Sequence, residues 1–93
     1  MAEARNRAVV QVRGMDYILV GKESEEYMQR VAAYVNRRME EIGYDALMSE
    51  QRLVVLTALN LADELFKAKE EIAQLRREAA EAQRRAQAQR KGQ

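Results

Sequence analysis

Apolar residues in the first third of the chain follow the pattern of two short strands. Residues 7–13 are rich in valine, and as a strand they place Ala8, Val10 and Val12 on one face and Val9, Gln11 and Arg13 on the other. Residues 17–20 are four consecutive apolar residues. Gly14, Met15 and Asp16 form the predicted turn, because Gly and Asp tolerate the positive φ of tight hairpins. The strand face that we expect to be buried carries Ala8, Val10 and Val12. Two strands alone are marginal, so this predicted hairpin needs a helix over one face or a second copy of the sheet.

A helix is predicted directly after the hairpin. Ser24 is a suitable N-cap, Glu25 and Glu26 stand where the helix dipole favours negative charge, and Gly43 is the expected stop. We expect the apolar stripe of this helix to cover the hairpin, so that residues 1–48 form a globular head. The stripe has gaps of three and four residues and consists of Met28, Val31, Ala32, Val35, Met39 and Ile42.

A second, much longer helix is predicted for residues 49–93. After the short connection 44–48, Ser49 is another N-cap, and no Gly or Pro follows until Gly92. A helix of about 40 residues is about 60 Å long. Because the head is far smaller, much of this helix needs a partner other than its own chain.

The long helix carries an unbroken heptad seam, spaced four and three residues in alternation. The alternative, one amphipathic helix packed on its own head, leaves most of the seam uncovered. The seam begins at Val54 and Ala58, and the residues predicted to carry self-association are Leu61, Leu65, Ala68, Ile72, Leu75, Ala79 and Ala82. The expected fold class is therefore α+β: a head of one β-hairpin and one helix, followed by a long C-terminal coiled-coil helix with a basic end that frays.

Charges beside the seam favour a parallel dimer. Two of three g-to-e′ pairs have opposite charge, which biases orientation without driving assembly. The g positions are Glu64, Glu71 and Glu78, and the e positions that follow them are Lys69, Arg76 and Gln83. Asp63 and Lys67, four residues apart, are predicted to form a surface ion pair.

Two features of the long helix each have two interpretations. Only alanine fills the seam from Ala79 onward, which fits close approach of several helices and equally a frayed end. A second apolar stripe fits docking under the head and equally a four-helix assembly. This stripe consists of Leu53, Leu56, Leu59, Ala62 and Phe66.

Composition excludes much catalytic chemistry. The 93 residues are 47% hydrophobic and 33% charged with a net charge of +1, and they include no His and no Cys. Zinc sites and His-dependent nucleophiles are therefore excluded, as are disulfides. We expect no enzyme activity, no metal and no cofactor. No apolar run exceeds five residues, and Glu3, Arg5 and Arg7 stand where a secretory signal is apolar, so we expect an intracellular protein.

A basic and aromatic face is predicted on the head helix, on the side away from its apolar stripe. It carries Tyr27, Arg30, Tyr34, Arg37, Arg38 and Glu41. One interpretation is a solvated face or a head-to-head contact. The other is a binding surface, since Arg and Tyr are enriched in interface hot spots. The residues predicted to bind a partner are Arg30, Arg37 and Arg38, followed by Arg13 and Lys22.

Four stretches between residues 10 and 65 form an ordered set of motifs. The hairpin reads Val10-x-Val12-x-Gly14-x-x-Tyr17-x-Leu19-x-Gly21, and Ser24-Glu-Glu-Tyr27 follows it. Val31-Ala-x-Tyr34-Val-Asn36 and Val55-Leu-Thr-Ala-Leu-Asn-Leu-Ala-Asp-Glu-Leu65 come next. In that order and spacing, these stretches resemble the bacterial cell-division protein ZapA family. The resemblance covers about residues 8–75, while the first seven residues and the tail after Ala82 carry no motif that adds to it.

The resemblance implies an architecture, a partner and a place in the cell. Two chains would pair into a parallel dimer, and two dimers would join tail to tail in an antiparallel four-helix bundle. Proteins of this family bind the tubulin-like division protein FtsZ and cross-link its protofilaments at midcell, in the cytoplasm. The implied protein is a two-ended, non-catalytic homotetramer that binds FtsZ filaments.

Two other functions compete with this one. Residues 82–93 contain Arg84, Arg85, Arg90 and Lys91 and no acid, so the tail is a candidate for binding nucleic acid or an anionic membrane. It lacks aromatic residues for base stacking, and four charges are few. A coiled-coil adaptor with another partner is the second alternative.

Overall fold

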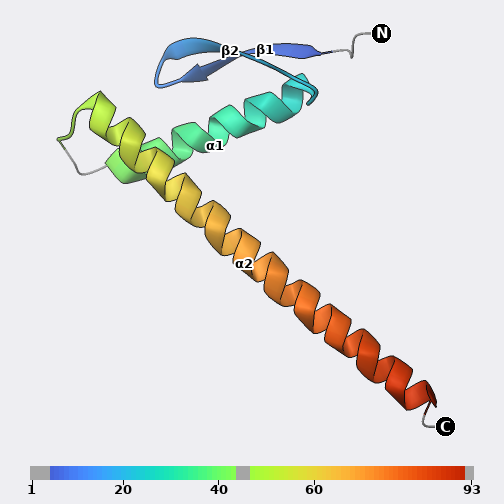
Figure 1. Ribbon diagram of the computed structural model, residues 1–93. Coiled ribbons are helices and arrows are strands. Elements are labelled where there is room, and N and C mark those ends of the chain that lie inside the picture. Colours follow the sequence, from blue (N-terminus) through green and yellow to red (C-terminus); the bar gives the residue numbers. More distant parts are fainter. Residues whose placement is uncertain (1–4, 44–46, 92–93) are drawn as a thin grey trace. The chain divides into compact units, whose positions relative to one another are not determined.

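The computed structural model describes residues 5–43 and 47–91 (Figure 1). In chain order they form β1 (Asn6–Val12), β2 (Met15–Gly21), α1 (Glu25–Gly43) and α2 (Glu50–Lys91). The predicted fold, a hairpin and a helix followed by one long helix, is confirmed. Part of the predicted connection 44–48 lies outside the described residues.

The chain divides into two compact units. The first is Met1–Thr57 and the second is Ala58–Gln93. The first unit, which we call the head from here on, therefore includes the first two turns of α2, which the sequence pattern assigned to the long helix. The second unit is the rest of α2, which we call the stalk.

The hairpin turn consists of Arg13 and Gly14, so the prediction that it spans Gly14 to Asp16 is wrong. Val12 pairs with Met15 in the antiparallel register, which leaves two residues between the strands. Arg13 has a φ of 55° and Gly14 a φ of 79°, and positive φ at both central positions defines a type I′ turn. The twist of this turn matches that of the strands, so Met15 and Asp16 belong to β2.

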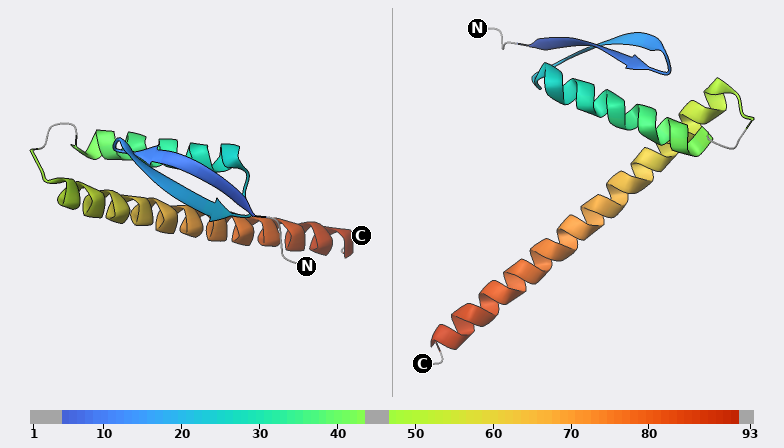
Figure 2. Two further views of the ribbon diagram at one scale, coloured as in Figure 1. Left: turned by 90° about the horizontal axis from the view of Figure 1, so that it is seen from above. Right: turned by 180° about the vertical axis from the view of Figure 1, so that it is seen from behind.

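The core of the head lies between β1 and α1. Ala8 and Val10 are buried against Met28 and Ala32, and Val12 and Leu19 pack partly on this cluster. The predicted buried face of the first strand is therefore confirmed. Figure 2, in the view from above, shows β1 beside α1 and β2 displaced to the far side, and the contacts of α1 with the sheet come mainly from β1.

The apolar stripe of α1 is only partly covered. Met28, Ala32 and Met39 are buried, whereas Val31, predicted to face the hairpin, is 42% exposed. The physical reason is that α1 packs under β1 and not under β2, so the flank that carries Val31 has no strand above it.

Both predicted N-caps are confirmed. The Oγ of Ser24 accepts a hydrogen bond from the Tyr27 N–H, and the Oγ of Ser49 accepts one from the Arg52 N–H, each at 3.1 Å. Gly43 is the last residue of α1, and a Cβ there would lie 3.2 Å from Cδ1 of the buried Leu53. The missing side chain thus allows the end of α1 to approach the start of α2.

Candidate partner-binding and self-association surfaces

Two side-chain amides of α1 fasten the outer edge of β1. Gln29 Nε2 donates to the Val9 carbonyl at 2.9 Å, and Asn36 Nδ2 donates to the Gln11 carbonyl at 2.7 Å. The Oδ1 of Asn36 also accepts the N–H of Arg13 at 3.0 Å, which holds the turn residue in its positive-φ conformation. Because Gln29 and Asn36 are seven residues apart, they lie on one flank of α1, two turns from each other.

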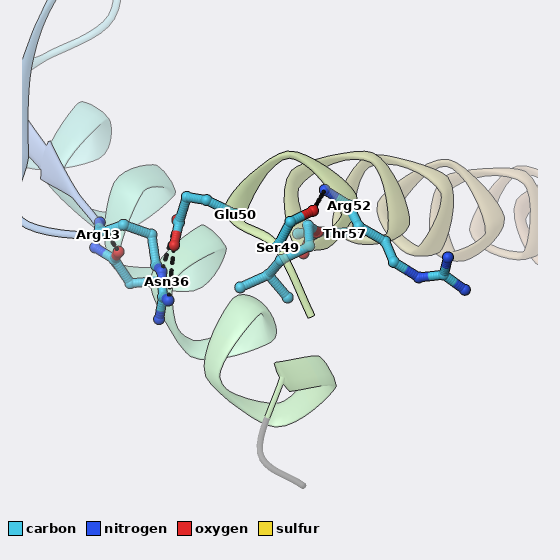
Figure 3. A network of polar contacts seen from close by, with 7 residues as sticks. Arg13, Asn36, Ser49, Glu50, Arg52 and Thr57 are labelled. Carbon is cyan, nitrogen blue, oxygen red and sulfur yellow. Dashed lines mark hydrogen bonds and ion pairs between the residues drawn. The ribbon is translucent and has the colours of Figure 1, made fainter. Parts of the chain in front are cut away.

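An ion pair joins the hairpin turn to the first residue of α2 (Figure 3). Arg13 Nε lies 3.0 Å from Glu50 Oε2, and Arg13 Nη2 lies 3.1 Å from Glu50 Oε1. This two-point geometry matches the planar guanidinium to the carboxylate. The hydrogen bond from Arg13 lowers the pKa of Glu50 from its ordinary value of 4.5, and the same bond raises the pKa of Arg13. The Arg13 guanidinium is therefore engaged within the head.

The lowered pKa of Glu50 predicts a pH-dependent contribution to head stability. The ionised carboxylate is favoured by folding, so the contribution is present above the unfolded pKa and is lost as pH falls through the lower folded pKa. Glu50→Gln should lower the melting temperature of the head at neutral pH, with the difference from wild type closing below about pH 4. Hydrogen exchange of the β1 amides, followed against temperature at each pH, measures this difference in head stability.

Arg13→Lys is the matched comparison, since it keeps the charge and loses the two-point geometry. It should fall between wild type and Glu50→Gln at neutral pH. A difference between wild type and Glu50→Gln that does not change with pH would show that the ion pair contributes nothing to the head.

The predicted basic face on α1 has two well-exposed arginines. Arg30 and Arg37 are exposed and seven residues apart, so they share the side of α1 away from the core. The Arg37 guanidinium lies over the Tyr34 ring, with Cζ 5.2 Å from the ring centroid. Among the described residues, neither guanidinium forms an ion pair.

The other predicted contact residues lie in different surroundings from Arg30 and Arg37. Arg38 is half-buried at the border of the face, and its Nη1 lies 2.8 Å from Glu41 Oε2. Lys22 is exposed just after β2. The structure thus brings Arg30 and Arg37 together on one face, places Arg38 beside them and commits Arg13 to Glu50.

The stalk presents its apolar seam to solvent in the single chain. Leu65, Ile72 and Leu75 are 51%, 47% and 56% exposed. The second stripe divides between the two units, because Leu53 is buried in the head whereas Phe66 in the stalk is exposed. Exposed leucine and isoleucine side chains at heptad spacing are what a coiled-coil partner covers.

The predicted Asp63–Lys67 ion pair is confirmed, with Lys67 Nζ 2.9 Å from Asp63 Oδ2. In the described part of the chain, no helix is long and apolar enough to cross a bilayer. Over the same residues, no three Asp or Glu side chains gather as a metal site would require.

Sequence patterns did not reveal the two amides or the Arg13–Glu50 pair. Gln29 and Asn36 border the apolar stripe at a spacing of seven, which is the one available signal. Glu50 is the first residue of α2, where the helix dipole already explains an acidic side chain. Polar contacts between distant segments have no periodicity to detect.

A small head of one hairpin and one helix, followed by a long helix with an exposed heptad seam, defines a class of α+β proteins with a coiled-coil stalk. The family model described as "Cell division protein ZapA" matches residues 9–91. The chain belongs to the ZapA cell-division protein family.

Individual relatives agree with this assignment. The cell division protein ZapA of Geobacillus thermodenitrificans (strain NG80-2) is 41% identical over 81 residues, which cover 82% of this chain and 89% of the relative. That of Geobacillus kaustophilus (strain HTA426) is 39% identical over 75 residues, covering 80% and 82%. The solved structure described as "ZapA mutant dimer from Geobacillus stearothermophilus" is 37% identical, with a TM-score of 0.69, and the match covers 83% of this chain and 91% of that one.

Proposed function

We propose that this protein binds FtsZ filaments in the cytoplasm and cross-links them at the midcell division site, without catalysis. The observation that supports this function best is that one chain has both an exposed seam and an exposed basic face. Leu65, Ile72 and Leu75 offer a surface for self-association, and Arg30 and Arg37 offer one for an acidic partner. Membership of the ZapA family supports the choice of FtsZ as that partner.

Self-association supplies the two ends of the cross-linker. A parallel dimer through the stalk seam would place two heads together, and two such dimers joined tail to tail would place heads at both ends. The solved relative described as a dimer supports the first step. The stalk residues for this assembly are Leu61, Leu65, Ala68, Ile72, Leu75, Ala79 and Ala82.

Arg30 and Arg37 are the leading filament contacts. Both are exposed, and the Tyr34 ring supports the Arg37 guanidinium. Arg38 and Lys22 are further candidate contacts with the filament. Arg13 contributes mainly by stabilising the head through its ion pair with Glu50. Single contacts of this kind are weak and steered by charge, and multiple heads on one assembly supply avidity.

A double charge reversal tests this contact surface. Arg30→Glu with Arg37→Glu should reduce co-sedimentation with polymerised FtsZ by about ten-fold or more, because both cations oppose acidic groups in the complex. Head folding is preserved, since both side chains are exposed.

Arg84→Glu with Arg85→Glu is the matched control, with the same charge change in the basic tail. It should leave filament binding unchanged. If the tail variant loses binding and the α1 variant keeps it, the contact surface lies in the tail. If neither loses FtsZ and the tail variant loses nucleic acid, the competing nucleic-acid function is supported.

A further inference from the structure

The two edges of the β-hairpin differ in a way that exposes one of them for pairing. At the β1 edge, the backbone groups of Val9, Gln11 and Arg13 bond to side chains of α1. These residues therefore point their N–H and C=O groups away from β2. In an antiparallel pair, two residues directly opposite each other either both direct their N–H and C=O groups toward the other strand or both direct them away from it. Their partners consequently direct their own backbone groups away from β1.

The partners define an open edge on β2. Val9 is opposite Ile18, Gln11 is opposite Asp16, and by the same alternation Arg7 is opposite Val20. Three N–H and three C=O groups of Asp16, Ile18 and Val20 thus face outward. Among the described residues, none of these backbone groups takes part in a hydrogen bond beyond the sheet. A row of free donors and acceptors is a template for another strand.

Apart from Leu19, the large apolar side chains of β2 are also mostly exposed, on both faces. Ile18 and Val20 on the outer face are 55% and 54% exposed, and Tyr17 on the inner face is 48% exposed because α1 packs under β1. Natural edge strands are usually protected by Lys, Pro or a bulge. This strand has none of these and carries one charge, Asp16.

We propose that β2 pairs in antiparallel fashion with β2 of a second copy of this chain, giving a four-stranded sheet in the order β1-β2-β2-β1. Centring the pair on Ile18 places Asp16 opposite Val20 of the second copy and uses all six outward groups. This register keeps the two Asp16 carboxylates apart and sets Tyr17 beside Leu19 of the second copy. Any shift of the centre loses at least one of the three pairs.

The features of this chain favour a second copy of itself as the partner of the open β2 edge. The pairing is self-complementary, as a two-fold interface must be. It also rests in part on the proposed function, since a parallel stalk dimer would bring two heads together and raise their effective concentration. The relative described as a dimer agrees with two copies meeting.

Single cysteines test the register, because the natural sequence contains no cysteine. In the proposed pair, the two Ile18 Cα atoms lie about 5.5 Å apart, within disulfide range. Ile18→Cys should therefore oxidise to a covalent dimer. Val9→Cys is the matched control, since Val9 lies on the same outer face with 56% exposure. Its Cα would be separated from its copy by three strand spacings, about 14 Å, and we expect at least about ten-fold less covalent dimer.

A mixture of Asp16→Cys and Val20→Cys chains checks the register independently of any effect of Ile18→Cys on folding. The mixed disulfide should form in preference to either homodimer. The mass of each reduced variant by light scattering separates the two proposals. An oligomer that forms no disulfide at residue 18 and no mixed disulfide would overturn the strand pairing and leave the stalk assembly standing. A monomer would overturn both.

Discussion

Replacing both Ile72 and Leu75 by lysine should leave no tetramer and should also weaken dimerisation strongly. Fully burying an exposed isoleucine or leucine side chain contributes about 1.5–3 kcal/mol, and about half of each side chain remains to be covered, so each chain loses roughly 1.5–3 kcal/mol of burial in the assembly. The two side chains are 47% and 56% exposed in the single chain, so the substitutions disturb little within it. The added ammonium groups would repel their copies across the seam. Self-association should weaken by more than about 100-fold, measured by light scattering across a dilution series.

Gln74→Lys with Ala80→Lys is the matched control, because it adds the same two charges to the stalk outside the seam. It should keep the wild-type mass. A double seam variant that remains tetrameric would show that the four-helix contact lies elsewhere on α2, for example along the stripe that includes Phe66.

Met28→Ala should destabilise the head strongly. Met28 is 5% exposed and packs against Ala8, Val10 and Ala32 at the centre of the core. Truncating a buried methionine costs about 2–5 kcal/mol through lost transfer free energy and the cavity left behind. A head this small has little stability to lose, so the variant should populate unfolded heads at 37 °C.

Tyr27→Ala is the matched control, one residue away but 48% exposed. Hydrogen exchange of the β1 amides should speed up markedly in Met28→Ala and little in Tyr27→Ala. Light scattering should give both variants the wild-type mass, since the stalk seam is untouched. Equal exchange in the two variants would mean that the core is not centred on Met28.

The parts of the fold that are periodic could be predicted from the sequence. The two-residue period of a strand over residues 7–13 predicts that Ala8 and Val10 share the buried face, and Ser24 and Ser49 predict both helix starts. These features depend on neighbours within one or two turns of the chain, where side-chain type and spacing determine the result.

The parts that depend on contacts between distant segments could not be predicted. Arg13 adopts positive φ because Asn36, on another element, accepts its N–H, and a sequence pattern assigns that conformation to Gly or Asp first. Val31 stays exposed because α1 lies under one strand instead of two. The sequence likewise predicts Arg13 as a partner contact, because its ion pair with Glu50 joins segments that are far apart in the chain.

The most direct test of a two-ended cross-linker is sedimentation of polymerised FtsZ at two speeds, with wild type and with the Ile72→Lys, Leu75→Lys variant. High speed pellets all filaments and reports binding, whereas low speed pellets bundles alone. We predict that wild type brings filaments down at low speed, and that the variant at an equal concentration of heads does so only at high speed. The account is contradicted if wild type fails to pellet filaments at low speed, or if the variant bundles them as well as wild type does.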